Sequence, residues 1–179
     1  MTTPTASPVS PSARKPADPS APEHTPAPNV PVRVAFASEA ARRLYGGVPH
    51  PATSRSAGVD VRACLDGDAA EIPPGGRLAI PSGLRVQPLC LGVAGFLYSR
   101  SGLGARDGLV VAQGVGVIDP DYTGEILVVL RNTSREARRI RRGDRIAQLV
   151  FQPVLMPLWR EGDLDATDRG AGGFGHTGA

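Results

Sequence analysis

The residue of this sequence best placed for catalysis is a carboxylate at the end of an apolar strand. The run Gly114-Val-Gly-Val-Ile118 leads into Asp119, and a turn follows before the next apolar run begins at Glu125. Burial at a strand end can tune the pKa of a carboxylate for work as a general base. Asp-Pro-Asp and Gly are also ordinary turn formers, so a purely structural role for Asp119 stays open at this point. Tyr122 is larger than a turn requires, which favours contact with a ligand.

A second group of residues is suited to binding an anion. In Ser99-Arg-Ser-Gly-Leu-Gly104, a strand runs into a helical turn and brings backbone N–H groups, the Ser101 hydroxyl and the Arg100 guanidinium to one point. Ser101 can equally be an ordinary helix N-cap. Gln148 is a lone polar residue in an apolar strand, and it is either an edge-facing residue or a ligand contact. Taken with Asp119, these residues suggest a phosphate-rich ligand and a carboxylate base.

The C-terminal segment 169–179 is rich in glycine and contains one arginine and one phenylalanine. Glycine loses the most conformational entropy on ordering, so the segment is either a frayed terminus or a flap that closes over an anion. In a flap, successive amides bind the anion, Arg169 supplies positive charge and Phe174 stacks on a ring. The tail alone does not distinguish these two interpretations.

The histidine and cysteine counts exclude several kinds of catalytic site. Of the 3 histidines, His24 and His176 lie in terminal segments, which leaves only His50 in the body of the chain. A Ser-His-Asp or Cys-His mechanism and a His/Cys zinc site are therefore not expected. The general base is expected to be a carboxylate, and any metal a hard cation bound by oxygen. Cys64 and Cys90 lack a CxxC spacing and are expected to be buried free thiols in a reducing compartment.

The elements that must position these residues are short strands. Apolar or alternating runs of strand length recur from residue 31 onward, separated by turns that carry Gly, Pro, Asp and Asn. The expected strands cover residues 32–36, 57–63, 77–80, 92–98, 109–112, 125–130 and 145–151, and a further strand precedes Asp119. One short helix is expected over 38–45 with Ser38 as its N-cap, and no long amphipathic stripe is present. The pattern predicts a single all-β domain, a sandwich or a barrel.

Composition divides the 179 residues into three parts. Residues 1–30 hold eight of the 18 prolines and are predicted to be a disordered Pro/Ala-rich extension. Residues 31–165 are expected to form the β domain, and residues 166–179 a flexible flap. The chain shows no signal peptide, transit peptide or membrane-spanning run, so a cytoplasmic protein is expected. The net charge of +3 is modest, and the basic run 138–145 lacks aromatic residues, which favours a solvated strand and turn over a nucleic-acid surface.

Five segments of the chain resemble, in order and spacing, the five motifs of the trimeric dUTPases. The segments are Ala57-Gly-Val-Asp-Val-Arg-Ala63, Arg100-Ser-Gly-Leu-Gly104, Gly116-Val-Ile-Asp-Pro-Asp-Tyr-Thr-Gly-Glu125, Arg142-Gly-Asp-Arg-Ile-Ala-Gln148 and Arg169-Gly-Ala-Gly-Gly-Phe-Gly-His-Thr-Gly178. They extend over residues 57–178, and the strand at 32–36 resembles the first strand of that family. The resemblance is greatest to the bacterial branch, through Arg62-Ala-Cys64 and Asp165-Ala-Thr-Asp-Arg169.

The resemblance implies a distorted jelly-roll-like β-barrel that forms a homotrimer, with three sites at subunit interfaces that each take motifs from more than one chain. It implies Mg²⁺-dependent hydrolysis of dUTP to dUMP and diphosphate, which keeps uracil out of DNA and supplies dUMP for thymidylate synthesis. Asp119 would deprotonate the water that attacks the α-phosphorus. Asp60 would act in the magnesium shell through water.

The other site residues that the resemblance implies divide between the nucleoside and the phosphates. Those near the nucleoside are Gln113, Gly116, Val117, Ile118, Tyr122 and Leu127. Those that hold the phosphates are Arg100, Ser101, Gly102 and Gln148. The main chain of 116–118 would pair with the uracil edge, and Tyr122 would pack on the deoxyribose. The tail would close from another subunit, with Phe174 over the uracil and with Arg169 and tail amides, Gly173 included, on the γ-phosphate.

Three positions depart from the family pattern without removing a catalytic group. Gln113 stands where bacterial relatives often carry Asn near the uracil, Leu127 offers only apolar contact, and His176 replaces a small hydroxyl residue.

Two other functions remain open: a dCTP deaminase or bifunctional relative on the same fold, and a nucleotide-binding module without turnover. The Gly-Phe-Gly tail argues against the first, and the intact set of catalytic and phosphate-binding residues argues against the second.

Overall fold

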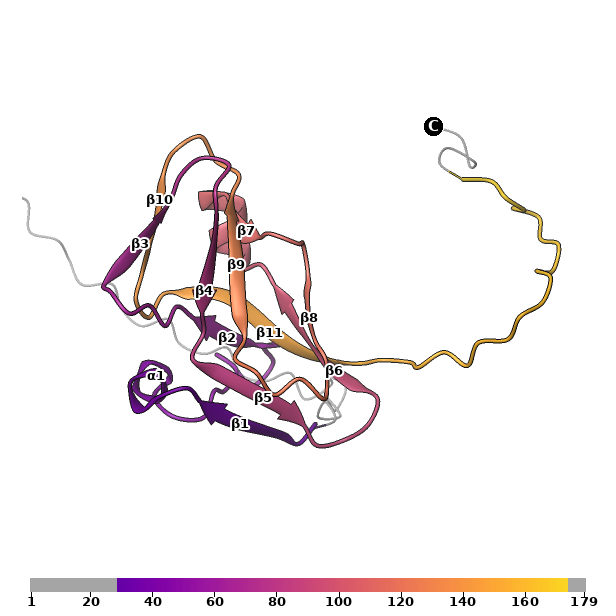
Figure 1. Ribbon diagram of the computed structural model, residues 1–179, viewed down its shortest axis with the longest axis horizontal. Coiled ribbons are helices and arrows are strands. Elements are labelled where there is room, and N and C mark those ends of the chain that lie inside the picture. Colours follow the sequence, from indigo (N-terminus) through magenta and orange to yellow (C-terminus); the bar gives the residue numbers. More distant parts are fainter. Residues whose placement is uncertain (1–28, 174–179) are drawn as a thin grey trace, which may run out of the picture.

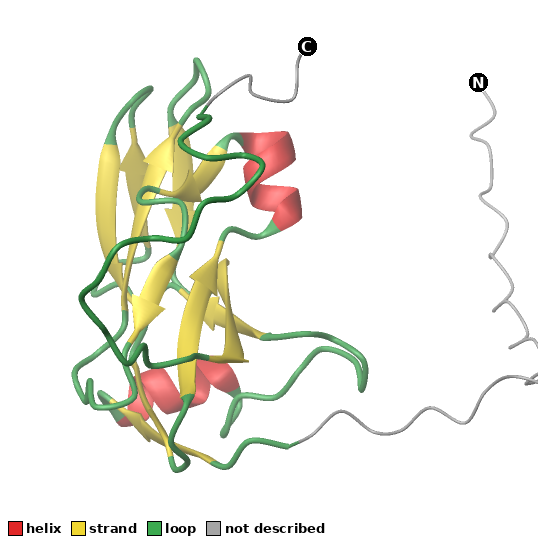
Figure 2. Cartoon of the chain, turned by 90° about the vertical axis from the view of Figure 1, so that its right-hand side faces the viewer, coloured by secondary structure: helices red, strands yellow, loops and turns green. Residues whose placement is uncertain are grey.

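The computed structural model describes residues 29–173, so most of the predicted N-terminal extension, His24, Phe174 and His176 lie outside the described residues. The elements of the described chain are β1 (Val32–Phe36), α1 (Glu39–Tyr45), β2 (Val59–Arg62), β3 (Ala69–Ile72), β4 (Arg77–Pro81), β5 (Leu84–Pro88), β6 (Val93–Tyr98), the π-helical turn η1 (Gly102–Arg106), β7 (Leu109–Val111), β8 (Gly116–Ile118), β9 (Leu127–Asn132), β10 (Arg138–Arg141) and β11 (Arg145–Pro153). The two helical segments lie at opposite ends of the strands (Figure 2).

Antiparallel pairing joins the strands into four small sheets (Figure 1). The largest has the order β2-β11-β6-β8, and a three-stranded sheet has the order β4-β9-β7. Two further pairs are β1-β5 and β10-β3. Most neighbours in these sheets are far apart in the sequence, as in the pairing of β2 with β11. The sequence-based prediction of an all-β, jelly-roll-like domain is confirmed.

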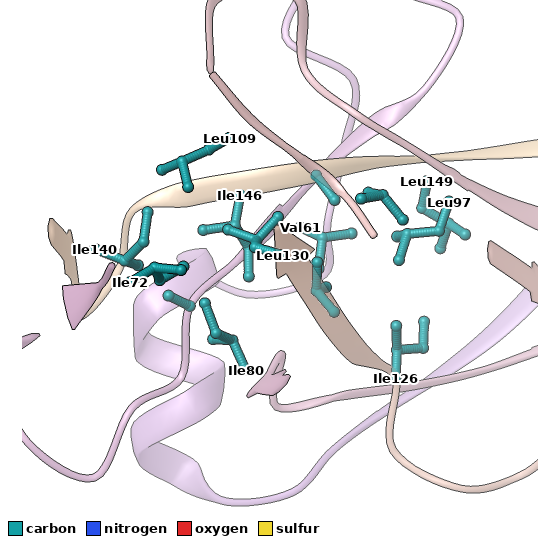
Figure 3. Packing of buried hydrophobic residues seen from close by; sticks show 14 of the residues in the cluster. Val61, Ile72, Ile80, Leu97, Leu109, Ile126, Leu130, Ile140, Ile146 and Leu149 are labelled. Carbon is teal, nitrogen blue, oxygen red and sulfur yellow. The ribbon is translucent and has the colours of Figure 1, made fainter. Parts of the chain in front are cut away.

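One hydrophobic core lies between the four sheets (Figure 3). Each sheet contributes to it: Val61 and Leu149 come from the four-stranded sheet, Leu130 from the three-stranded sheet, Ile140 from β10 and Val86 from β5. The first four of these side chains are at most 1% exposed. Burial of a Val, Leu or Ile side chain contributes about 1.5–3 kcal/mol, so this shared core holds the small sheets in one body.

Helix α1 is capped and anchored by local chemistry. The Ser38 hydroxyl accepts a hydrogen bond from the Ala41 amide at 3.0 Å, which confirms the predicted N-cap, and Gly46 ends the helix in the left-handed conformation. The Tyr45 hydroxyl donates to the Ser82 carbonyl and accepts from the Arg62 amide, both at 2.9 Å. Burial raises the pKa of Tyr45, so its hydroxyl stays protonated and keeps α1 attached to β2.

Two strands were not predicted, and the prediction for the cysteines needs correction. The strands β3 and β5 were missed, and β10 was foreseen only as a solvated strand and turn in the basic run. Cys64 and Cys90 are free thiols, as expected, but both are partly exposed rather than buried. Burial raises the pKa of the Cys64 thiol nonetheless. No helix of the described chain is long and apolar enough to span a membrane.

Candidate active site

The residues expected to hold phosphates gather around one polar pocket of about 390 Å³, hereafter the phosphate pocket. Its lining residues are Ala52, Ser56, Ala57, Gly58, Asp60, Arg100, Ser101, Gly102, Arg145 and Gln148. The four residues of the β domain that are predicted to hold phosphates are therefore brought together, and Asp60 lies with them. They come from β2, from β11 and from the turn after β6, segments far apart in the sequence.

A network of ion pairs fixes the charged groups of this pocket. Arg100 Nε donates to Asp60 Oδ1 at 2.7 Å, and Arg145 Nη1 donates to Asp60 Oδ2 at 3.0 Å. Arg100 also donates to the Arg145 carbonyl at 3.4 Å. Two guanidinium groups that share one carboxylate retain net positive charge and unused N–H donors. The pocket is therefore built to receive an anion with several oxygens.

A β-bulge in β11 places Arg145 and Gln148 on the same pocket. In a regular strand, residues three apart point to opposite faces of the sheet. The pairing of β11 with β2 shifts register between Arg145 and Ala147, and Ile146 and Ala147 are consecutively buried. The extra residue lets Arg145 face the pocket while Gln148, opposite Asp60 in the ladder, faces it too.

The turn after β6 presents Ser101 and Gly102 to the pocket. The Gly104 amide donates to the Arg100 carbonyl at 2.8 Å, which closes the turn. Ser101 has helical backbone angles, φ −54° and ψ −47°, and within the described chain its hydroxyl makes no capping hydrogen bond. Ser101 therefore stands at the N-cap position of η1 but does not cap the turn through its side chain. The neighbouring Ser99 has the structural role, because its hydroxyl accepts a hydrogen bond from the Val111 amide at 2.8 Å.

The residues expected near the nucleoside surround a second pocket of about 250 Å³, hereafter the nucleoside pocket. Its lining residues are Leu97, Gln113, Gly116, Val117, Ile118, Asp119, Tyr122, Glu125 and Leu127. Strand β8 forms one wall and is an edge strand, because it pairs only with β6 in the four-stranded sheet. An edge strand presents unpaired backbone N–H and C=O groups, which can hydrogen-bond to the edge of a planar base.

Asp119 and Tyr122 lie at the two ends of one tight turn after β8. The Tyr122 amide donates to the Asp119 carbonyl at 3.0 Å, and the Tyr122 hydroxyl donates to the Glu125 carbonyl at 2.9 Å. No described residue donates a hydrogen bond to the Asp119 carboxylate, so Asp119 is not a side-chain cap of this turn. Asp119 is exposed in the described chain, so the burial that could tune a base is not provided by its own chain. The carboxylate is free to contact a ligand.

The phosphate and nucleoside pockets lie at opposite edges of one sheet. Asp60 belongs to β2 and residues 116–118 to β8, and the order β2-β11-β6-β8 puts two strands between them. Three inter-strand steps correspond to about 14 Å. The two pockets share no lining residue. The predicted site residues thus form two separate groups on one chain.

The C-terminal arm, residues 154–173, runs away from the body of the protein (Figure 1). Arg169 is exposed, and its Nε donates to the Gly172 carbonyl at 2.9 Å within the arm itself. Gly173 is also exposed. Neither residue lines the pockets described above, so the structure does not bring them to the other predicted site residues. Phe174, the predicted base-stacking residue, lies outside the described residues.

In the phosphate pocket, Arg145 and the loop before β2 are the residues that sequence reasoning did not assign. In the nucleoside pocket, Leu97 and Glu125 were not assigned. Arg145 had a usable signal, since it belongs to the same motif as Gln148. The loop residues Ala52 and Ser56 gave none, because neither side chain is chemically distinctive there. A reciprocal turn shapes this loop: the Ser56 hydroxyl accepts from the Thr53 amide at 3.1 Å, and the Ser56 amide donates to the Thr53 carbonyl at 3.1 Å.

The donor set of the phosphate pocket suits a magnesium ion that arrives on a triphosphate. The described residues contain no cluster of three or more His, Cys, Asp and Glu side chains that could hold a metal directly. Asp60 is the single carboxylate of the pocket, next to the Gln148 amide. Mg²⁺ keeps several waters and commonly uses one or two carboxylates with substrate phosphates. Asp60 therefore fits an outer-shell role and not a cage of protein ligands.

An all-β domain with an arginine-rich anion pocket and a separate edge-strand pocket has the features of a nucleotide-binding protein. A family model for dUTPases matches residues 45–178. Deoxyuridine 5'-triphosphate nucleotidohydrolases of Escherichia coli O9:H4 and Shigella boydii serotype 18 are each 45% identical over 132 residues, 73% of this chain and 87% of the relative. The chain belongs to the dUTPase family.

Solved structures agree on the fold. The dUTPase of Streptococcus mutans has a TM-score of 0.59 at 26% identity and covers 72% of this chain and 98% of its own. A Staphylococcus bacteriophage 80alpha dUTPase with bound dUpNHpp has a TM-score of 0.70 at 24% identity and covers 83% and 99%. A dUTPase from phage phi11 of S. aureus, described with a structural Mg(II) ion, has a TM-score of 0.65 at 22% identity and covers 76% and 99%.

Proposed function

We propose that this protein hydrolyses dUTP to dUMP and diphosphate. The observation that carries the proposal is the free Asp119 carboxylate at the end of edge strand β8, in one wall of the nucleoside pocket. Family membership supports it, because the curated relatives are nucleotidohydrolases of deoxyuridine 5'-triphosphate. Uracil would pair with the main chain of 116–118, and the exposed edge of β8 offers the groups that such pairing needs.

In the proposed reaction, Asp119 accepts a proton from a water molecule as the water oxygen attacks the α-phosphorus. A new P–O bond forms to the water oxygen, the bond from the α-phosphorus to the bridging oxygen of the β-phosphate breaks, and diphosphate leaves. Arg100, Ser101, Gly102 and Gln148 hold the phosphates, and the two guanidinium groups beside Asp60 offset their charge. Bound Mg²⁺ would neutralise further phosphate charge, with Asp60 and Gln148 hydrogen-bonded to its waters.

A complete site requires more than one copy of the chain. The nucleoside and phosphate pockets are separate on one chain, and the arm with Arg169 points away from both. We propose a homotrimer in which the nucleoside pocket of one copy faces the phosphate pocket of the next, and the arm closes over them. Tyr122 would then pack on the deoxyribose and Leu127 would border it, with Gln113 near the base. Arg169, the Gly173 amide and Phe174 would cover the γ-phosphate and the uracil.

The test is diphosphate release from dUTP, dCTP, dTTP and UTP in parallel, with and without Mg²⁺. Release from dUTP alone, abolished by chelation, is the expected result. Ammonia release from dCTP would instead identify a deaminase, and nucleotide binding without turnover would identify a non-catalytic module. Asp119→Asn should keep nucleotide binding and lose most turnover, since the amide cannot accept the proton. Near-normal turnover by this variant would refute the assignment of Asp119 as the base.

A further inference from the structure

A second basic pocket adjoins the phosphate pocket, and its arginines other than Arg100 and Arg145 have no role in the proposed chemistry. It lies between η1 and β10, has a volume of about 480 Å³ and is hereafter called the arginine pocket. Its positive charge comes from Arg100, Arg106, Arg138, Arg139 and Arg145. Two of these, Arg100 and Arg145, also line the phosphate pocket, so the two pockets are continuous at these side chains.

The carboxylates near the arginine pocket offset only part of its charge. Asp107 and Asp144 lie in its lining, and Asp60 and Glu136 pair with three of its arginines from outside the lining, which leaves an excess of one positive charge. Asp107 accepts from Arg106 at 2.9 and 3.0 Å, and this contact holds the pKa of the Asp107 carboxyl below its ordinary value. Arg138 pairs with Glu136 at 3.3 Å. No carboxylate of the described chain forms an ion pair with Arg139.

The arm carries the opposite charge directly before Arg169. Segment 161–168 contains Glu161, Asp163, Asp165 and Asp168 and no basic residue, and we call it the acidic segment. All eight of its residues are exposed. None of its carboxylates forms an ion pair with a residue of the described chain. An isolated run of four negative charges is unfavourable beside a triphosphate, so this segment needs a positive partner where the flap closes.

The reach of the arm sets the place where the acidic segment must lie. A chain extends at most about 3.6 Å per residue, so the backbone of Asp165 lies within about 14 Å of the backbone of Arg169, wherever Arg169 binds a phosphate. The phosphate pocket and the arginine pocket meet at Arg100 and Arg145. We propose that the acidic segment of one copy of this chain docks in the arginine pocket of a second copy when the flap closes. This inference rests on the proposed function, since that function brings Arg169 to the phosphates.

A second copy is the favoured partner because of where the arm begins. The arm leaves β11 after Pro153, whereas Arg145 is the first residue of that strand. Eight residues of strand separate them by about 26 Å. The eight residues from Pro153 to Glu161 span at most about 29 Å, so Glu161 could reach Arg145 of its own chain only if the arm were fully extended and folded back along its own strand. The arm instead points away from the body (Figure 1).

Amide hydrogen exchange of the acidic segment tests the proposal directly. The full-length protein is measured with and without α,β-imido-dUTP, together with Arg139→Glu, Asp163→Arg and the double variant. An exposed ion pair contributes a factor of about two to five, so each single variant should lose up to about fivefold protection in the presence of the analogue. The double variant should recover it. Arg85→Glu, at an exposed position on β5 outside the arginine pocket, is the matched control and should behave as the unmodified chain.

Mixed assemblies distinguish docking on a second copy from docking on the same chain. Chains with Arg139→Glu keep an intact acidic segment, and chains with Asp163→Arg keep an intact arginine pocket. When the two are refolded together, the acidic segment of the Arg139→Glu chain should regain protection only by docking on its partner. Unchanged exchange in the mixture, or the same exchange in all variants, would overturn the proposal. If the unmodified protein binds inorganic diphosphate, Arg139→Glu abolishes this binding and the exchange of the arm does not change, the arginine pocket binds a free anion and the docking proposal is refuted.

Turnover of dUTP is recorded for every variant as a separate measurement. Absence of turnover in the unmodified protein would refute the proposed function. If turnover is normal and the amide exchange of the acidic segment is the same in the unmodified chain and in Arg139→Glu, only the docking proposal is refuted.

Discussion

Gly124 has a contact that makes it a probe of sugar recognition. A Cβ atom added at Gly124 would lie 2.5 Å from the Tyr122 hydroxyl oxygen and 2.6 Å from the ring carbon that carries it. Backbone strain does not complicate the substitution, because the φ of Gly124 is not positive. Gly124→Ala should therefore act by displacing the Tyr122 ring, the group proposed to pack on the deoxyribose.

The structure allows the size of this effect to be worked out. Ordinary contact begins at 3.4 Å, so the end of the ring must move by about 1 Å. The movement also breaks the hydrogen bond from the Tyr122 hydroxyl to the Glu125 carbonyl, a loss of about 1 kcal/mol at most for an exposed pair. A misplacement of this size costs up to about 100-fold in rate. We expect kcat/KM for dUTP to fall by about 10- to 100-fold, with little change in Tm.

The assay compares kcat/KM for dUTP and UTP in Gly124→Ala, Tyr122→Phe and Gly67→Ala. Gly67 is the matched control, because a Cβ there would contact nothing within 4 Å. Tyr122→Phe removes only the hydroxyl and should keep most of the preference for the deoxyribose. Gly124→Ala should show a smaller preference for dUTP over UTP. The displaced ring no longer excludes a 2′-hydroxyl, so kcat/KM for UTP should fall less than kcat/KM for dUTP. Unchanged preference between dUTP and UTP in Gly124→Ala would refute the role assigned to Tyr122.

Three further predictions concern stability, the flap and thiol reactivity. Asn132 is fully buried and bonds to the Ile72 and Glu136 carbonyls and to Ser134, so Asn132→Ala should lower the free energy of unfolding by about 3 kcal/mol in denaturant titration. Truncation after Asp168 should leave Tm unchanged and reduce dUTP turnover by at least about 100-fold, because a closing arginine acts on the transition state. Burial raises the pKa of the Cys64 thiol. In a Cys90→Ser background, the reaction of Cys64 with a disulfide reagent should therefore accelerate only at a pH above the pKa of an ordinary thiol.

The features that the sequence predicted well depend on local chemistry. Ser38 caps α1 as expected, because a serine before a short helical run satisfies a free amide within one turn. The hairpin around Asp119 was recognised for a similar reason, since Pro120 and Gly124 mark its turn within a few residues. The missed strand β3, by contrast, is only four residues long and lacks clear alternation: its burial depends on the distant strand β10.

The arrangement of the phosphate pocket could not be read from residue order. Alternation along β11 places Arg145 and Gln148 on opposite faces, and only the bulge seen in the pairing with β2 reconciles them. The contacts of Asp60 with Arg100 and Arg145 join positions 40 and 85 residues apart. Likewise, the exposure of Asp119 could not be foreseen, because an apolar strand does not reveal whether its end is covered by its own chain.

The exposed apolar side chains of the arm connect these separate features. Leu155, Met156, Leu158 and Trp159 are between 83 and 94% exposed, in the segment between β11 and the acidic segment. Burying four such side chains against another surface is worth about 6–12 kcal/mol, comparable to the cost of associating two proteins. In the proposed homotrimer, a second copy would supply the surface that covers these side chains. Residues 154–173 of that homotrimer would therefore contribute both apolar surface for assembly and Arg169 for the phosphates.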